Sequence, residues 1–174
     1  KTNPRVDEFG YWAASDIFFE AGPHLEPYGG FNQYYGILTI HGSPKPIFHA
    51  FKFLSRMEGP RYEPANLHPP TEAADAICTA SGSATRALFW NYHHPGQARK
   101  DWHDEIVLPL SDHLKDAPLV RVVTATLKAG QGSAFEAWKQ AGRPANLTRT
   151  EEEALAARSV PIYRFVLART DHGA

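Results

Sequence analysis

The sequence predicts a mainly β protein in which an antiparallel β-sandwich follows a shorter segment with the order strand, long loop, helix. Aromatic residues are concentrated at the start of the chain, where 12 of the 21 lie between Phe9 and Phe53. From about residue 61 onward the pattern changes to short alternating runs separated by turn residues, which is typical of antiparallel sheets. A chain of 174 residues with 43% hydrophobic residues is long enough to bury a core.

The first segment contains one apolar run and one helical pattern. Residues 9–15 read FGYWAAS and predict a short strand of the kind that is buried on both faces of a parallel sheet. A helix is predicted over residues 47–57, because Pro46 suits a first helical position and Gly59 suits a stop. The long loop between them is punctuated by glycines and prolines. The expected buried stripe of the helix consists of Ile47, Phe51 and Leu54.

The second segment contains the predicted strands of the sandwich. Residues 81–83, which read SGS, are expected to form the turn between the first two of them. A proline at position 109 indicates an edge strand or a strand end. The predicted strands cover residues 74–80, 84–93, 103–110, 119–127 and 162–168.

Two helices are expected to interrupt these strands. A short one covers residues 133–140, where Phe135 and Trp138 lie three apart on one side. The other begins near residue 148, in a stretch that reads TRTEEE and holds two overlapping capping boxes. These boxes pair Thr148 with Glu151 and Thr150 with Glu153.

Composition excludes several functional classes. The net charge is −1, so no basic surface for nucleic acid or anionic lipid is expected, and no apolar run is long enough to span a membrane. Because Cys78 is the only cysteine, we expect no internal disulfide and interpret this residue as a small buried hydrophobe. The chain opens without Met, which suggests a piece of a longer protein.

Metal and nucleophile chemistry have no supporting motif. His93 and His94 are adjacent, so on a strand they point to opposite faces, and the nine histidines show no H-E-x-x-H spacing. We expect no metal site and interpret the histidines as solvated or hydrogen-bonded. No serine lies in a G-x-S-x-G elbow, so a nucleophilic triad is not expected either.

Two carboxylates, Asp16 and Glu20, follow the apolar run where it opens into the long loop. In parallel α/β barrels such strand ends form the active-site face. Aromatic rings beside a carboxylate suit a sugar, because rings stack on its C–H groups while the carboxylate accepts hydrogen bonds from its hydroxyls. The alternative is that Asp16 caps the loop and Glu20 is solvated. Spacing alone leaves both interpretations open.

Residues 11–20, which read YWAASDIFFE, resemble a motif of glycoside hydrolase family 39, the β-xylosidases and α-L-iduronidases, where it commonly runs YWxFSDxFEE. The later stretches PYGGF at 27–31 and GSPKPIFHAF at 42–51 are similar to the family's FHGGF and GIPKPxxxAF. Weaker similarity to the xylosidase C-terminal domain occurs at LFWN, residues 88–91, and AGRP, residues 141–144. The resemblance covers most of the chain in order.

This resemblance implies that residues 1–58 are the last strand, loop and helix of a (β/α)8 catalytic barrel, and that residues 59–174 are the accessory β-sandwich. It implies a substrate-binding site in which Trp12 forms the floor and Glu20 contacts the glycone hydroxyls, with Asp16 and Phe19 beside them. Phe19 stands where the family usually has a glutamate, and Tyr28 where it usually has a histidine.

The resemblance further implies a retaining hydrolase that releases terminal β-linked xylose and needs no cofactor. Its partners are a xylo-oligosaccharide or related glycoside and the missing N-terminal barrel of the same protein. The resemblance implies an acid/base glutamate after strand four of the barrel and a nucleophile glutamate on strand seven, both before Lys1. No Asn-Glu-Pro acid/base motif occurs in the chain, so we expect the chain alone to be inactive. The alternative is a free-standing carbohydrate-binding sandwich, with Trp90, Tyr92 and Trp102 as candidate platform residues.

Overall fold

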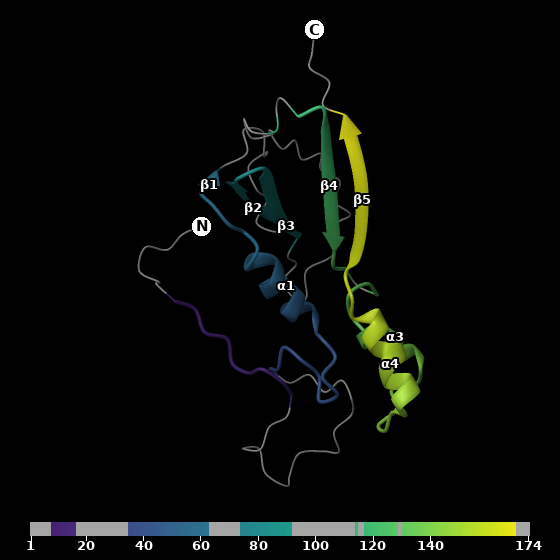
Figure 1. Cartoon of the computed structure of the whole chain (residues 1–174). Coiled ribbons are helices and arrows are strands. Elements are labelled where there is room, and N and C mark those ends of the chain that lie inside the picture. The colour runs from purple at the N-terminus through teal and green to yellow at the C-terminus, as the bar shows by residue number, and fades with distance from the viewer. Residues whose placement is uncertain are drawn as a thin grey trace. The chain divides into compact units, whose positions relative to one another are not determined.

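The computed structural model describes residues 8–16, 35–62, 74–91, 114, 117–128 and 130–169, with the side chains of residues 74 and 75 left out. These residues form mostly strands with a few helices (Figure 1). By internal contacts the chain divides into two compact units. One comprises Lys1–Phe51 and Thr124–Arg164, and the other comprises Lys52–Val123 and Phe165–Ala174. The predicted domain boundary after residue 58 stays a prediction.

A three-stranded antiparallel sheet with the order β1-β2-β3 lies in the second unit. Strands β2 (Ala74–Ser81) and β3 (Ala84–Asn91) pair along their whole length, and the short β1 (Arg61–Tyr62) adds to the free edge of β2. The predicted turn is confirmed: Ser81 pairs with Ala84 across a two-residue loop, and Gly82 has the positive φ of 55° that such hairpins require.

Cys78 lies in the interior of this sheet, as its alternating context predicts. It is buried, and it faces Tyr62 on one neighbouring strand and Ala87 on the other. Burial and the Cys78 thiol raise the pKa of the Tyr62 phenol above its usual 10.0, so this tyrosine is neutral near pH 7. Both side chains therefore act as packing groups here.

The other two long strands, β4 (Leu119–Thr126) and β5 (Ile162–Arg169), form a separate two-stranded sheet. Their arrows run in opposite directions, so the pair is antiparallel (Figure 1). The predicted strands at 119–127 and 162–168 are thereby confirmed, with ends shifted by one residue. The predicted strand at 103–110 lies outside the described residues, and the packing of the two sheets into a sandwich stays a prediction.

Three expectations for the first segment were wrong: the strand at 9–15, the end of the helix and part of its buried stripe. Residues 9–14 form no strand, and only Ser15 makes an isolated parallel bridge, to Leu38. A strand needs a partner that pairs with it along its whole length. Among the described residues, the backbone partners of this run are limited to the short stretch 36–38. The helix α1 (Pro46–Leu54) begins at Pro46 as expected but ends three residues before Met57. Its buried residue is His49, whereas Leu54 of the predicted stripe is exposed.

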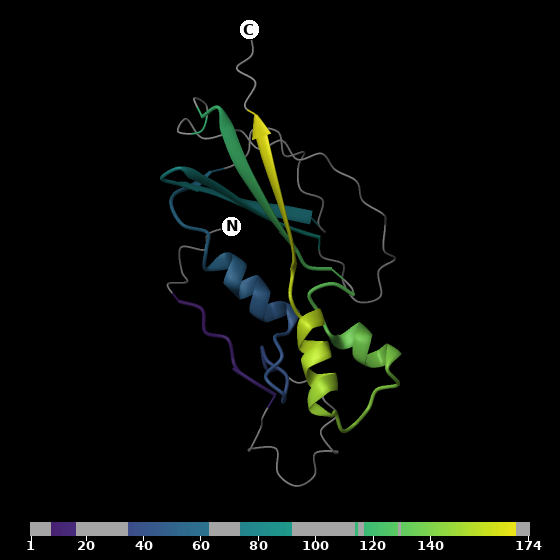
Figure 2. The ribbon, with the colours of Figure 1, turned by 45° about the vertical axis from the view of Figure 1, so that its right-hand side comes forward.

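Helices α3 (Phe135–Gln140) and α4 (Arg149–Arg158) pack side by side in the first unit, and α4 leads into β5 (Figures 1 and 2). Their core contains Ala134, Trp138 and Leu155. The end of α3 is closed by two backbone bonds, from Gly142 to Lys139 and from Arg143 to Trp138. Gly142 and Arg143 both have positive φ, which this type of helix ending uses.

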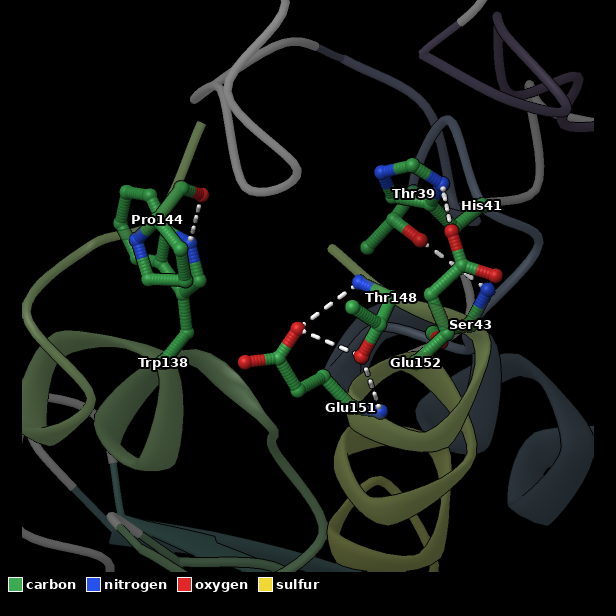
Figure 3. A network of polar contacts seen from close by, with 8 residues as sticks. All are labelled: Thr39, His41, Ser43, Trp138, Pro144, Thr148, Glu151 and Glu152. Carbon is green, nitrogen blue, oxygen red and sulfur yellow. Dashed lines mark hydrogen bonds and ion pairs between the residues drawn. The ribbon is translucent and has the colours of Figure 1, made fainter. Parts of the chain in front are cut away.

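The first predicted capping box is confirmed, and the second is wrong. Thr148 is the N-cap of α4: its hydroxyl accepts from the Glu151 N–H, while its own N–H donates to the Glu151 carboxylate at 2.7 Å (Figure 3). Thr150 lies inside the helix, where it cannot adopt the extended backbone of an N-cap. Glu153 instead pairs with Arg149 at 3.0 Å.

The capping box makes the stability of α4 depend on pH. Hydrogen bonds from the Thr148 backbone and hydroxyl lower the pKa of Glu151 below its usual 4.5. A carboxylate with a lowered pKa in the folded state stabilises fully above pH 4.5, and this contribution is lost as the pH falls below that value. Glu151→Gln keeps an acceptor at this position but cannot titrate. We therefore expect the melting temperature of the wild type minus that of Glu151→Gln to decrease between pH 7 and pH 3.

The matched control for this comparison is Glu153→Gln, since Glu153 lies one turn into the same helix and has no role in the box. Melting temperatures are measured at half-unit pH steps. The contributions of the other carboxylates are the same in variant and wild type, so they cancel in the difference between the two melting temperatures. A difference that is constant with pH would show that the box does not contribute through the charge of Glu151.

Candidate substrate-binding site

Three backbone segments meet at Asp16, where the apolar run ends. The Asp16 N–H donates to the Leu38 carbonyl at 3.0 Å, and one Asp16 carboxylate oxygen accepts from the Gly36 N–H at 3.0 Å. The ammonium Nζ of Lys45 lies 2.7 Å from that oxygen and 2.6 Å from the other. We call Asp16, Gly36 and Lys45 the strand-end cluster.

The Asp16 carboxylate is buried, so it needs partners that compensate its charge. Its side chain is 1% exposed and that of Lys45 is 18% exposed, so this ion pair is withdrawn from water. A buried carboxylate is stable only with a paired charge and further hydrogen bonds, and Lys45 and Gly36 supply both. Of the two interpretations that the sequence left open, these contacts favour Asp16 as the capping residue of the loop over Asp16 as a sugar ligand.

Trp12 lies four residues before this cluster and presents its ring to solvent. Its side chain is 66% exposed, while the neighbouring Tyr11 packs edge-on against Phe51 of α1, with ring centroids 5.3 Å apart. An exposed indole is the kind of apolar wall on which a sugar can stack. Phe19 and Glu20, the other two predicted binding residues, lie outside the described residues, so the grouping of these side chains stays a prediction.

The strand-end cluster requires a glycine at position 36. A Cβ added to Gly36 would lie 2.2 Å from the Ser15 carbonyl carbon and 2.3 Å from the Asp16 nitrogen. Both atoms are backbone atoms, so a side chain at this position would force the two segments apart. Gly36 thus allows the chain to return from the loop in direct contact with the residues that precede it.

Within the first unit, two histidines contact helix α4 and the residue that follows it. His41 Nδ1 lies 2.7 Å from the Glu152 carboxylate, close to the hydrogen bond between the Ser43 N–H and the Thr39 hydroxyl (Figure 3). His49 Nε2 lies 2.6 Å from the carbonyl oxygen of Ser159, where α4 ends. A carbonyl only accepts, so Nε2 carries the proton. His49 confirms the expectation of hydrogen-bonded histidines.

No group of three or more potential metal ligands occurs among the residues that the structure describes. Within the same residues, no helix is long and apolar enough to cross a membrane. His93 and His94 lie outside that part of the chain. The described part of the site therefore consists of the exposed Trp12 and the buried ion pair between Asp16 and Lys45, which fixes the backbone that follows Trp12.

Comparison with known proteins identifies the family of this chain and its fold. The family model for glycosyl hydrolases family 39 matches residues 1–173, and the chain belongs to that family. It is 27% identical over 148 residues to a β-xylosidase of Caldicellulosiruptor saccharolyticus, covering 84% of this chain and 28% of the relative. It is 28% identical over 152 residues to a β-xylosidase of Geobacillus stearothermophilus, covering 86% of this chain and 27% of the relative.

Solved structures share the fold. A monomeric β-xylosidase from Caulobacter crescentus superimposes with a TM-score of 0.66 at 20% identity, covering 92% of this chain and 33% of that one. The GH39 enzyme from Xanthomonas axonopodis pv. citri gives a TM-score of 0.62 at 18% identity, covering 91% and 31%. The chain thus spans less than a third of the length of the relatives that it matches.

Sequence reasoning singled out Asp16 but missed the partners that explain it. Lys45 is 29 residues away and Gly36 is 20, and no local pattern connects positions at those separations. One signal was available: Lys45 lies between two prolines, directly before the apolar residues Ile47 and Phe48. A charge in such a place is seldom left without an opposite charge nearby.

Proposed function

We propose that this chain is the C-terminal part of a retaining glycoside hydrolase that releases terminal β-linked xylose from xylo-oligosaccharides or related glycosides. The observation that carries the proposal is the match to glycosyl hydrolases family 39 over residues 1–173, together with relatives named β-xylosidase that are about three times as long. In this proposal residues 1–58 end a (β/α)8 barrel, and residues 59–174 form the accessory sandwich.

The proposed binding subsite is built from residues at the end of the last barrel strand. Trp12 supplies an apolar wall, which its exposed ring supports, and Glu20 accepts hydrogen bonds from the glycone hydroxyls with Phe19 beside it. Asp16 holds the strand end in place, as its contacts with Gly36 and Lys45 support. This chemistry needs no cofactor.

The reacting groups lie outside this chain in our proposal. Retaining hydrolysis uses two carboxyl groups about 5–5.5 Å apart, one as acid/base and one as nucleophile. The remainder of the barrel would supply both and would also cover the first segment. Phe9 and Tyr35, each at least 65% exposed, support such a partner, because large exposed aromatic side chains usually mark a surface that another part of a protein contacts.

The carbohydrate-binding alternative receives less support. A sugar platform needs several aromatic rings that share one face, and Trp90 is the one candidate that the structure describes. It lies on β3 and is 39% exposed. Tyr92 and Trp102, the other candidates, lie outside the described residues.

Replacement of Glu20 tests the proposed subsite in the full-length protein. A charged acceptor to a hydroxyl contributes about 1.5–3 kcal/mol, so Glu20→Ala should lower kcat/KM on nitrophenyl β-xyloside by roughly 10- to 150-fold. The melting temperature should change little, because a loop carboxylate that serves the substrate carries no core packing.

The control variant is Glu8→Ala, which removes an exposed acidic side chain from the first segment and should leave kcat/KM unchanged. Equal kinetics for wild type and Glu20→Ala would remove Glu20 from the subsite. A full-length wild type without activity on β-xylosides would contradict the proposed function itself.

A further inference from the structure

We infer that Lys45 is a positioning residue of the proposed sugar site, which it serves through Asp16 without contacting the substrate. The inference rests on the proposed function and deepens it. In this role Lys45 fixes the backbone that carries Trp12. It also holds residues 16 and 36, the two ends of the intervening segment, close to each other.

Lys45 is attached to the returning segment by its main chain as well as by its side chain. Its backbone N–H donates to the Ile37 carbonyl at 3.0 Å, and the neighbouring Pro44 forms an antiparallel bridge with Leu38. Its ammonium group lies within 2.7 Å of both Asp16 oxygens. One residue thereby connects the returning segment to the end of the apolar run.

The attachment extends to the residues that directly follow Trp12. The Ile37 N–H donates to the Ala13 carbonyl at 3.0 Å, and the Leu38 N–H donates to the Ala14 carbonyl at 3.1 Å. The backbone next to the indole is thus bonded to the same short segment that Lys45 holds from the other side. A shift of residues 36–38 must therefore move Trp12.

Charge is the reason why a lysine is needed at this place. The Asp16 carboxylate is buried, and the Gly36 N–H alone cannot compensate for an ionised group withdrawn from water. Without Lys45, the buried carboxylate has to reach water, find another cation or take up a proton, and each of these changes weakens its bond to Gly36. Because the Asp16 side chain is 1% exposed, its carboxylate is not accessible to a sugar hydroxyl.

The test compares Lys45→Met, which removes the charge but keeps an apolar stem, with Lys45→Arg, which keeps the charge. Both are made in the full-length protein, together with the control Arg149→Met, which removes a cation from the exposed pair with Glu153. Two quantities are measured: hydrogen exchange of the amides at residues 36–38, and kcat/KM on nitrophenyl β-xyloside.

We expect Lys45→Met to accelerate exchange at residues 36–38 and to lower kcat/KM by about 10- to 100-fold, because a misplaced binding group is costly even far from the reacting atoms. Lys45→Arg should recover most of both quantities, and Arg149→Met should change neither. If Lys45→Met does not fold, the double variant Asp16→Asn with Lys45→Met removes the uncompensated charge but still lacks the bond between positions 16 and 45, so it should show both effects in the same direction.

Unchanged exchange at residues 36–38 would overturn the inference, since Lys45 would then not hold them. Faster exchange with unchanged kinetics would overturn it too, because the role would be structural only. An inactive wild type refutes the proposed function by itself, before any variant is compared, and exchange at residues 36–38 still decides whether Lys45 fixes that backbone.

Discussion

Trp138→Ala is expected to lower the free energy of unfolding of the helical part of the first unit by about 3–5 kcal/mol, the usual cost of removing a buried aromatic side chain. Trp138 is 8% exposed and packs between Ala134 and Leu155, and its indole N–H donates to the Pro144 carbonyl at 3.1 Å (Figure 3). The substitution therefore leaves a cavity and removes the donor that satisfies this carbonyl.

Urea unfolding of the chain, followed by far-ultraviolet circular dichroism, measures this loss without relying on tryptophan emission. Trp138→Phe is the matched control: it keeps an apolar ring but removes the donor and part of the indole volume, so it should cost less, about 1–3 kcal/mol. A loss of less than about 0.5 kcal/mol for Trp138→Ala, the range of neutral surface substitutions, would show that this core does not stabilise the unit.

Gly36→Ala is expected to destabilise the first unit by about 3 kcal/mol, at the upper end of the cost of overpacking. The added methyl group meets the backbone of Ser15 and Asp16 at 2.2 and 2.3 Å, so it cannot be accommodated by a side-chain rotation. The parallel contact between the residues before Asp16 and those after Gly36 must open, and the hydrogen bond from Gly36 to the carboxylate must lengthen.

Gly10→Ala provides the comparison, because a Cβ at that position meets nothing within 4 Å. The two variants insert the same methyl group into the same segment, so the difference between their urea midpoints isolates the close approach at Gly36. Equal midpoints would contradict the packing of the strand-end cluster.

Local sequence patterns predicted the structure correctly where the residues in contact are close together in the sequence. The hairpin of β2 and β3 followed from alternation and a turn centred on Gly82, and α4 followed from the pairing of Thr148 with Glu151 three residues later. In each case the residues that decide the structure lie within a few positions of one another. Their physical preferences can be read directly from the sequence.

The same reasoning failed where the structure depends on distant residues. The apolar run at 9–15 has the composition of a buried strand, yet among the described residues it finds only a short partner at 36–38 and forms no strand. The stripe predicted for α1 ignored His49, whose burial depends on the carbonyl of Ser159, 110 residues away. The sequence indicated Asp16 as a candidate functional residue, but its partners Lys45 and Gly36 could be identified only from the folded structure.

The central claim, that this chain is part of a retaining β-xylosidase-like hydrolase, is tested most directly by the anomer that the full-length protein releases first. Proton magnetic resonance of nitrophenyl β-xyloside during hydrolysis distinguishes the two anomers of xylose before they interconvert. We predict that β-xylose appears first from the full-length protein and that the 174-residue chain alone releases nothing. Initial release of α-xylose, or turnover by the chain alone that survives repurification, would contradict the claim.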